Sequence, residues 1–238
     1  MGRKAVCLLS GGLDSCVTSF IAKDKRFDVY ALSIQYGQLH TKELSCARTI
    51  ADVLQAKKHV VLDVDYTKIG GSSLLESSSD CITTHDLSDV GKEIPSTYVP
   101  ARNTVFLSLA LAYAEAIDAD AIFLGVNAVD FSGYPDCRPD FIQAYQHMAN
   151  LATKRGIQGN SILIKAPLLH LTKSEIIQQG VHLNVPFEST WSCYQGKEKA
   201  CGCCDSCILR LKGFMDAKTD DPVAYDEYPS WYTHFKKK

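Results

Sequence analysis

The sequence predicts an α/β fold built on a doubly wound, mostly parallel sheet of five strands. Short runs of Val, Ile and Leu recur along the chain, and segments with a helical spacing of apolar residues separate them. One of these runs ends in two glycines and leads directly into a helical segment. The composition, with 46% hydrophobic and 22% charged residues among 238, is typical of a globular protein that can bury a sizeable core.

The five strand-like runs are short and apolar, as strands covered on both faces are. They are expected at residues 5–9, 29–34, 60–64, 121–126 and 162–166. Helices are expected at residues 16–22, 41–56, 103–117, 139–155 and 172–180. Asn103 is a candidate N-cap, Pro139 suits a first helical position, and Thr172 forms a capping box with Glu175. In such folds, ligands bind at the carboxyl ends of the strands.

The composition shifts after Pro186 towards Cys, Gly, Lys and aromatic residues. We therefore expect a larger domain at residues 1–186 and a small cysteine-rich subdomain with a C-terminal tail at residues 187–238. Residues 70–96 are rich in Gly and Ser and lack periodicity, which predicts a long loop. This loop is interpreted as an active-site lid or a dimer contact, with an ordinary surface excursion as the alternative.

Charge and hydropathy exclude some classes of function. The net charge is −2, and the lysines and arginines are scattered, so the sequence lacks the broad basic surface that a stable nucleic-acid partner requires. No apolar stretch reaches the length of a membrane span, and no signal peptide is recognisable at the start. We expect a cytoplasmic protein with no membrane partner.

Residues 10–15, Ser-Gly-Gly-Leu-Asp-Ser, predict a phosphate-binding loop. The two glycines allow a tight turn with inward-pointing amides, and the following helix adds partial positive charge at its N-terminus. Ser10 and Ser15 supply hydroxyl groups, and Asp14 is a candidate ligand for Mg²⁺. The lysine of the GxxxxGK[ST] loop is missing. A plain serine-capped turn is the alternative interpretation.

Five of the ten cysteines lie between residues 193 and 207, in a chain expected to occupy a reducing compartment. Four of them follow the spacing C-x7-C-x2-C-x2-C, which suits one structural zinc ion per chain. The expected ligands are Cys193, Cys201, Cys204 and Cys207, and Cys203 is interpreted as a bystander. An iron–sulfur cluster and a set of reactive thiols are the alternatives.

Two segments next to predicted strand and helix ends are candidates for binding a substrate. Arg102, at the start of a predicted helix, can reach a phosphate or a carboxylate, although a surface salt bridge is the alternative. The loop after residues 121–126 carries two carboxylates, two aromatic rings and an arginine, which suit a guanine-like base with an acid group. These residues are Asp130, Phe131, Tyr134, Asp136 and Arg138. A loop of turn formers with a solvated charged face is the alternative.

Residues 10–15 resemble the SGGxDS signature of the ATP pyrophosphatase superfamily. Together with YVPARN, GVNAVDFSGYPDCRPDF, LTKSEII and the four spaced cysteines, they make the chain resemble the 7-cyano-7-deazaguanine synthase family from about residue 4 to residue 210. The resemblance implies an adenine nucleotide alpha hydrolase-like fold at residues 1–186. It implies ATP contacts at Leu9, Ser10, Gly11, Gly12, Leu13, Asp14, Ser15, Cys16, Val17, Thr18 and Ser19, with Asp14 and Ser15 catalytic.

The activity implied by the resemblance is that of an ATP-dependent ligase in the biosynthesis of queuosine, a modified tRNA base. Such an enzyme converts 7-carboxy-7-deazaguanine and free ammonia into the corresponding nitrile through an adenylated carboxylate and an adenylated amide. ATP with Mg²⁺ would be a co-substrate, because a carboxylate is a poor electrophile. No glutaminase-like region is present to supply the nitrogen.

Two other functions remain open at this point. A tRNA-thiolating enzyme of the same superfamily would need a reactive cysteine near the ATP site and a basic surface. A zinc-stabilised nucleotide sensor would bind ATP without turnover. The apolar C-terminal residues Trp231, Tyr232 and Phe235 further predict a homodimer.

Overall fold

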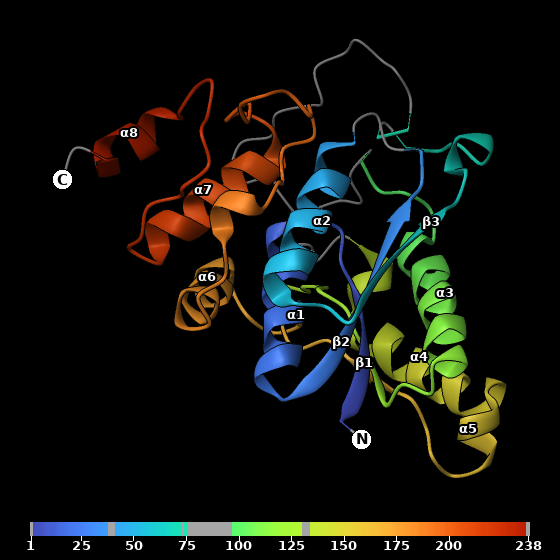
Figure 1. The fold of residues 1–238 in the computed structure, drawn as a ribbon. Helices are drawn as coiled ribbons and strands as arrows, with labels where there is room; N and C mark the ends of the chain where they lie inside the picture. Colours follow the sequence, from blue (N-terminus) through green and yellow to red (C-terminus); the bar gives the residue numbers. More distant parts are fainter. Residues whose placement is uncertain (1, 38–40, 73, 76–96, 130–133, 237–238) are drawn as a thin grey trace.

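The computed structural model describes residues 2–37, 41–72, 74–75, 97–129 and 134–236. Its centre is a parallel sheet in the order β3-β2-β1-β4-β5 (Figure 1). The strands are β1 (Arg3–Leu8), β2 (Phe27–Gln35), β3 (Lys58–Asp63), β4 (Ala121–Phe123) and β5 (Leu163–Lys165). The predicted fold class, with five parallel strands, is therefore confirmed.

Helices cover both faces of the sheet (Figure 1). The α-helices are α1 (Leu13–Asp24), α2 (Lys42–Leu54), α3 (Arg102–Ala116), α4 (Pro139–Ala152), α5 (Lys154–Ile157), α6 (Lys173–His182), α7 (Asp205–Asp216) and α8 (Ser230–Lys236). Three short 3-10 helices are η1 (Tyr66–Lys68), η2 (Pro135–Cys137) and η3 (Phe187–Ser189). Helices α1 and α2 pack on one face, with α6 against α1, while α3 and α4 pack on the other.

Each face of the sheet has its own apolar core. On the α3 side, Val6, Leu32 and Ile122 from three strands pack against Leu107 and Ala110 of α3. On the α1 side, residues of α1 and α2 pack around Leu9, and α6 adds Ile176 and Ile177. Because both faces of the central strands are buried, these strands read in the sequence as continuous apolar runs rather than as alternating patterns.

The order of the strands creates a crevice where the phosphate loop (residues 10–15) lies. Strand β1 has β2 on one side and β4 on the other, so the direction of winding changes at β1. Ligands of doubly wound sheets bind outside the carboxyl ends of the strands at such a point. The loops that follow β1 and β4 both open there, which places residues 10–15 beside residues 124–127.

The backbone of the phosphate loop is enclosed closely by other segments. Gly11 has a φ of 94°, and a Cβ atom on it would overlap the carbonyl oxygen of Glu43 in α2. A Cβ atom on Gly125, which follows β4, would lie 2.8 Å from the backbone nitrogen of Ser15. The Trp191 amide also donates a hydrogen bond to the Gly11 carbonyl at 2.9 Å. The loop can hold this position only with glycine at residues 11 and 125.

Several predicted boundaries differ from the observed ones. Helix α1 begins at Leu13 rather than at residue 16, which places Asp14 and Ser15 in its first turn. The prediction that Asn103 caps its helix is wrong, because Ala101 occupies the N-cap position and makes no side-chain capping bond. The helix expected at residues 139–155 breaks at Thr153, which caps the short helix α5. The capping box of Thr172 and Glu175 is confirmed at the start of α6.

The residues after Pro186 build a third apolar cluster around Trp191, Leu211, Tyr225 and Tyr232. This cluster does not stand apart from the sheet domain, because α7 packs extensively against α6. Within this cluster, Arg210 is 3% exposed and forms an ion pair with Asp221 at 2.7 Å. The domain boundary at residue 186 remains a prediction.

Trp231, Tyr232 and Phe235 pack within this cluster, and Tyr232 is fully buried. The apolar residues that suggested a homodimer therefore pack in large part against the chain's own core.

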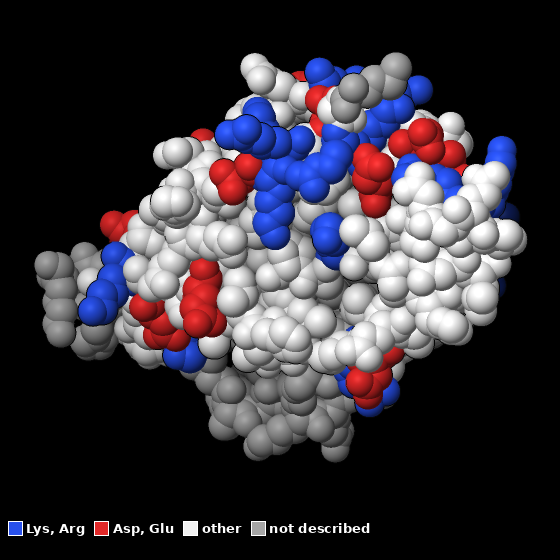
Figure 2. Space-filling model, turned by 90° about the horizontal axis from the view of Figure 1, so that it is seen from below, with Lys and Arg blue, Asp and Glu red and all other residues white. Residues whose placement is uncertain are grey.

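Charges of both signs occur on the face at the amino ends of the strands. Figure 2 shows lysine and arginine side chains gathered on part of this face, with acidic side chains at their margins. Lys57 and Asp28 form one ion pair there, at 3.6 Å. Within the described residues, no helix is both long enough and apolar enough to span a membrane.

We predict that Gly11→Ala destabilises the protein by about 3 kcal/mol or more, because the added methyl group meets backbone atoms of α2 that cannot move independently. Urea-induced unfolding measures the change. Gly159→Ala is the matched control: Gly159 also has a positive φ, of 77°, but has no atom near its Cβ position, so backbone strain alone costs about 1 kcal/mol. Equal losses in the two variants would show that the enclosure of the loop is unimportant.

Candidate active site

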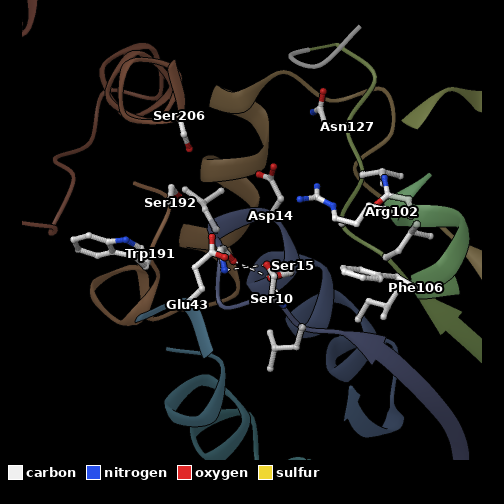
Figure 3. Close-up of a pocket in the computed structure, with 18 of the residues that line it drawn as sticks. Ser10, Asp14, Ser15, Glu43, Arg102, Phe106, Asn127, Trp191, Ser192 and Ser206 are labelled. Atoms are coloured by element: carbon white, nitrogen blue, oxygen red, sulfur yellow. Dashed lines mark hydrogen bonds between the residues drawn. The ribbon is translucent and has the colours of Figure 1, made fainter. Parts of the chain in front are cut away.

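A cavity of about 290 Å³ lies at the carboxyl ends of β1, β2 and β4. It is lined by segments far apart in the sequence (Figure 3). They include the phosphate loop, the end of β2, the starts of α2 and α3, the loop after β4, the start of α6, α7 and the residues Trp191, Ser192 and Tyr194. A mostly apolar hollow with a few converging polar groups is the usual form of a small-molecule site.

Hydroxyl groups hold the phosphate loop in shape. The Ser10 and Ser15 hydroxyls lie 3.0 Å apart, and Ser15 Oγ also donates to the Gly12 carbonyl at 3.0 Å. The Gly12 amide donates to Ser10 Oγ at 3.2 Å. These bonds fix the turn at the positive end of α1, where an anion is stabilised.

Not all of the expected ATP-binding residues reach the cavity. Those that line it are Leu9, Ser10, Gly12, Leu13, Asp14 and Ser15. Gly11 supports the turn from behind, against α2. Cys16, Val17, Thr18 and Ser19 are buried within α1 and do not line the cavity. Contact between these four residues and ATP stays a prediction.

Lys173 supplies the cation that the loop motif lacks. Its ammonium group lies 2.8 Å from both carboxylate oxygens of Asp14, and both side chains are largely buried. The capping box places Lys173 in the first turn of α6, and packing of α6 on α1 brings it to the cavity. Sequence reasoning missed this residue, because 159 positions separate it from its partner.

Arg102 also points into the cavity, from the start of α3 towards Asp14 (Figure 3). Its guanidinium group donates to the Tyr36 hydroxyl at 3.3 Å. Among the described residues it forms no ion pair with a carboxylate. Tyr134 lines the same cavity, and its hydroxyl lies 3.1 Å from Thr97 Oγ1. A half-buried guanidinium group that has no acidic partner among the described residues is suited to an anionic ligand.

Of the remaining predicted substrate residues, the two that the structure describes do not line the cavity. Asp136 is 6% exposed, and its Oδ2 accepts a hydrogen bond from the Asn103 amide at 3.0 Å, so it serves as the missing cap of α3. Arg138 is exposed and does not line the cavity. Asp130 and Phe131 lie outside the described residues. The structure gives Asp136 a structural partner, and the reading of a base by these residues stays a prediction.

Glu43 is a second cavity residue that sequence reasoning missed. It lies in the first turn of α2, and its side chain points towards the phosphate loop beside Trp191 and Ser192 (Figure 3). Burial raises the pKa of the Glu43 carboxyl to about 7, although the Arg102 guanidinium acts in the opposite direction. The only signal in the sequence was its position in a helix predicted for other reasons.

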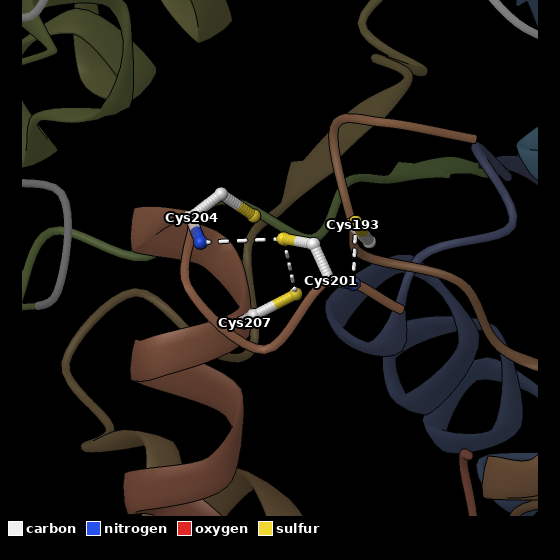
Figure 4. Close-up of side chains that lie close together, drawn as sticks. All are labelled: Cys193, Cys201, Cys204 and Cys207. Carbon is white, nitrogen blue, oxygen red and sulfur yellow. Dashed lines mark hydrogen bonds between the residues drawn. The ribbon is translucent and has the colours of Figure 1, made fainter. Parts of the chain in front are cut away.

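The four spaced cysteines come together beside α7. Figure 4 shows Cys201, Cys204 and Cys207 around the start of this helix, with Cys193 on a separate segment. All four are buried, their sulfur atoms lie within 4.8 Å of one another, and Cys201 Sγ and Cys207 Sγ are 3.8 Å apart. Thiolates about 2.3 Å from one zinc ion in a tetrahedron lie about 3.8 Å apart. The group thus fits a single metal ion, and Cys203 lies outside it.

Hydrogen bonds favour charged sulfur at two of these cysteines, Cys193 and Cys201. The Cys201 amide donates to Cys193 Sγ at 3.3 Å, and the Cys204 amide donates to Cys201 Sγ at 3.4 Å. The neighbouring thiols of Cys193, Cys204 and Cys207 hold the pKa of Cys201 well below its usual range. Metal ligation requires the thiolate form.

The fold and the cavity define an α/β enzyme with an SGGxDS phosphate loop and a separate group of four cysteines that could hold a metal ion. Comparison with known proteins gives the family. The chain belongs to the family described as "Queuosine biosynthesis protein QueC", whose model matches residues 4–218.

Relatives support the same assignment over nearly the whole chain. The chain is 55% identical to the 7-cyano-7-deazaguanine synthase of Desulfatibacillum aliphaticivorans over 226 residues, covering 94% of this chain and 97% of the relative. It is 48% identical to that of Thermoplasma volcanium over 233 residues, covering 98% and 95%. It is 52% identical to that of Coxiella burnetii over 227 residues, covering 94% and 98%. The family resemblance read from the motifs is confirmed.

We predict that Asp136→Ala lowers the free energy of unfolding by about 1–2 kcal/mol, because α3 loses its cap at a buried position. Chemical denaturation measures the loss. Asp140→Ala, which removes an exposed carboxylate from the first turn of α4, should cost less than about 1 kcal/mol. Unchanged stability in Asp136→Ala, combined with weakened substrate binding, would restore the substrate-reading role predicted from the sequence.

Proposed function

We propose that this protein converts 7-carboxy-7-deazaguanine, ammonia and ATP into 7-cyano-7-deazaguanine, as the names of its relatives suggest. The observation that carries the proposal is the convergence of the phosphate loop, Lys173 and Arg102 on one cavity. Such a cavity offers amides and cations for the phosphates of ATP and a guanidinium group for a carboxylate.

ATP binds with its phosphates at the phosphate loop. The amides at the start of α1, the hydroxyls of Ser10 and Ser15 and the Lys173 ammonium group stabilise their negative charge. Asp14 holds Lys173 in place and, from the same position, can ligate a Mg²⁺ ion that enters with ATP. When bound, that ion supplies charge stabilisation for the departing pyrophosphate.

The carboxylate of the purine-like acid binds at Arg102, on the opposite side of the cavity from Glu43. One carboxylate oxygen attacks the α-phosphorus of ATP, and pyrophosphate leaves with the electrons of the broken P–O bond. The acid is then an acyl adenylate, which ammonia converts into an amide with loss of AMP. Catalysis of the first step consists of positioning and charge stabilisation, and no side-chain nucleophile is required.

The amide is then activated in the same way. Its oxygen attacks the α-phosphorus of a second ATP, pyrophosphate leaves, and one N–H proton is lost. When the C–O bond breaks, AMP leaves with the electron pair of the C–O bond. The second N–H proton is lost, and the electron pair of that N–H bond forms the third carbon–nitrogen bond of the nitrile. We propose free ammonia as the source of nitrogen.

The tRNA-thiolating alternative is not favoured. Its chemistry needs an accessible thiolate near the nucleotide, and among the described residues the cysteine that lines the cavity is Cys137. Burial raises the pKa of Cys137 to about 12, and it does the same for Cys7 and Cys16. The named relatives are synthases of a small molecule.

We propose zinc as the metal of the four-cysteine group, in a purely structural role. The sulfur–sulfur distances support one ion rather than an iron–sulfur cluster, in which the four cysteines are divided among two or four irons and the sulfurs bound to different irons lie farther apart. Four protein ligands leave no open position for a substrate. Cytoplasmic location and a homodimer remain expectations from the sequence.

The proposed function is tested by measuring pyrophosphate and nitrile. With ATP, Mg²⁺ and ammonia, the protein should release pyrophosphate only when 7-carboxy-7-deazaguanine is present, and mass spectrometry should detect the nitrile. Asp14→Asn should lower turnover by about 100-fold or more, because Lys173 and the proposed metal ion lose their shared anion, while the circular dichroism spectrum at 25 °C stays that of the folded protein. Release that depends on tRNA would favour thiolation, and no release would contradict the proposed activity.

Metal analysis should find about one zinc per chain and no absorption in the visible range. We predict that Cys204→Ser loses the metal and lowers the melting temperature by about 10 °C, since ligation contributes to the folding of this region. Cys203→Ser should keep both the zinc and the stability, because Cys203 lies outside the ligand group. A brown protein containing sulfide, or equal losses in the two variants, would contradict this assignment.

A further inference from the structure

Two carboxylates line the cavity in the described part of the chain, and their surroundings differ. Asp14 is ion-paired with Lys173 at 2.8 Å. The Glu43 carboxylate makes no ion pair and accepts no hydrogen bond from any described residue. The half-buried side chain of Glu43 faces the cavity.

Packing fixes Glu43 next to the phosphate loop. Its carbonyl oxygen lies directly against Gly11, with no space for a Cβ atom between the two segments. From this position the side chain reaches the part of the cavity between Ser192 and Ser10 (Figure 3). In an acyl adenylate, one oxygen atom joins the reacting carbon to the α-phosphate. The reacting carbon therefore lies between Arg102, which binds the carboxylate in the proposed function, and the phosphate loop, which Glu43 borders.

Neighbouring cations do not neutralise Glu43 directly. Lys42, the preceding residue, donates to the carbonyls of Lys197 and Glu198 and lies over the Trp191 ring, 3.5 Å from its centre. Arg102 is held at Tyr36, on the other side of the cavity. The cavity thus has a cationic side for an acid and an anionic side for a nitrogen that carries protons.

We infer that the Glu43 carboxylate accepts the protons released by the nitrogen atom during catalysis. The inference rests on the proposed function. As ammonia attacks the acyl adenylate, its lone pair forms the C–N bond, the C–O bond breaks with its electrons passing to AMP, and an N–H proton moves to Glu43. After this proton has left for solvent, the same carboxylate takes the N–H proton whose loss completes the nitrile.

A carboxylate in this cavity has one other obvious use, which is to accept hydrogen bonds from the N–H groups of the purine-like ring. The two roles differ in what they affect. A ring-binding carboxylate acts before adenylation, so its loss weakens binding of the acid in every step. A proton acceptor acts only after ammonia enters, so its loss leaves adenylation intact.

The experiment separates adenylation from the nitrogen steps. Exchange of radiolabelled pyrophosphate into ATP, measured with the acid but without ammonia, reports adenylation. Nitrile formation with ammonia reports the whole reaction. We expect Glu43→Gln to retain exchange within about threefold, with an unchanged KM for the acid, and to lose about 100-fold or more in nitrile formation. Glu43→Asp, which keeps a carboxylate, should recover part of this loss.

Asp52→Asn is the matched control, since it removes an exposed carboxylate from the same helix and should leave both rates unchanged. Parallel loss of exchange and nitrile formation in Glu43→Gln would overturn the inference in favour of ring binding. Full nitrile formation in Glu43→Gln would overturn it as well. Absence of acid-dependent exchange in the wild-type protein would instead refute the proposed function, on which the inference rests.

Discussion

The phosphate loop is enclosed by the backbone of its neighbours, and the rest of the site depends on this enclosure. Gly11 lies against the first turn of α2, and Gly125 lies against the first turn of α1. A side chain at either glycine would separate segments that now touch. Because these contacts are between main-chain atoms, the same packing that positions the loop also positions Glu43 and the loop after β4 around it.

The C-terminal region takes part in the same arrangement. The Trp191 amide bonds to the Gly11 carbonyl, and Trp191 and Ser192 form one wall of the cavity. These residues directly precede Cys193, and Arg210 anchors them through Thr190 Oγ1 at 2.7 Å. The cysteine group therefore stabilises the wall of a site in which it takes no chemical part. In the proposed function, this explains why a four-cysteine group, which would hold a metal ion with no open position, accompanies the cavity proposed to bind ATP.

Local patterns in the sequence were sufficient for the fold and for two parts of the site. Apolar runs and glycines predict the sheet and the phosphate loop, and the cysteine spacing predicts the ligand group. Lys173 and Glu43 were missed, because they reach the cavity only through the packing of α6 and α2 on the sheet domain. The structural role of Asp136 was missed for the same reason, since its partner is the amide of Asn103, 33 positions away. Long-range contacts of this kind leave no local signal.

The central claim is that the acid is activated by transfer of AMP at the phosphate loop, and the fate of its oxygen atoms tests this claim most directly. The reaction is run with 7-carboxy-7-deazaguanine that carries ¹⁸O in both carboxyl oxygens, and the products are analysed by mass spectrometry. We predict that both labels are recovered in AMP, one in each of two AMP molecules per nitrile, and that pyrophosphate is unlabelled. Label in inorganic phosphate, or AMP without label, would contradict this account.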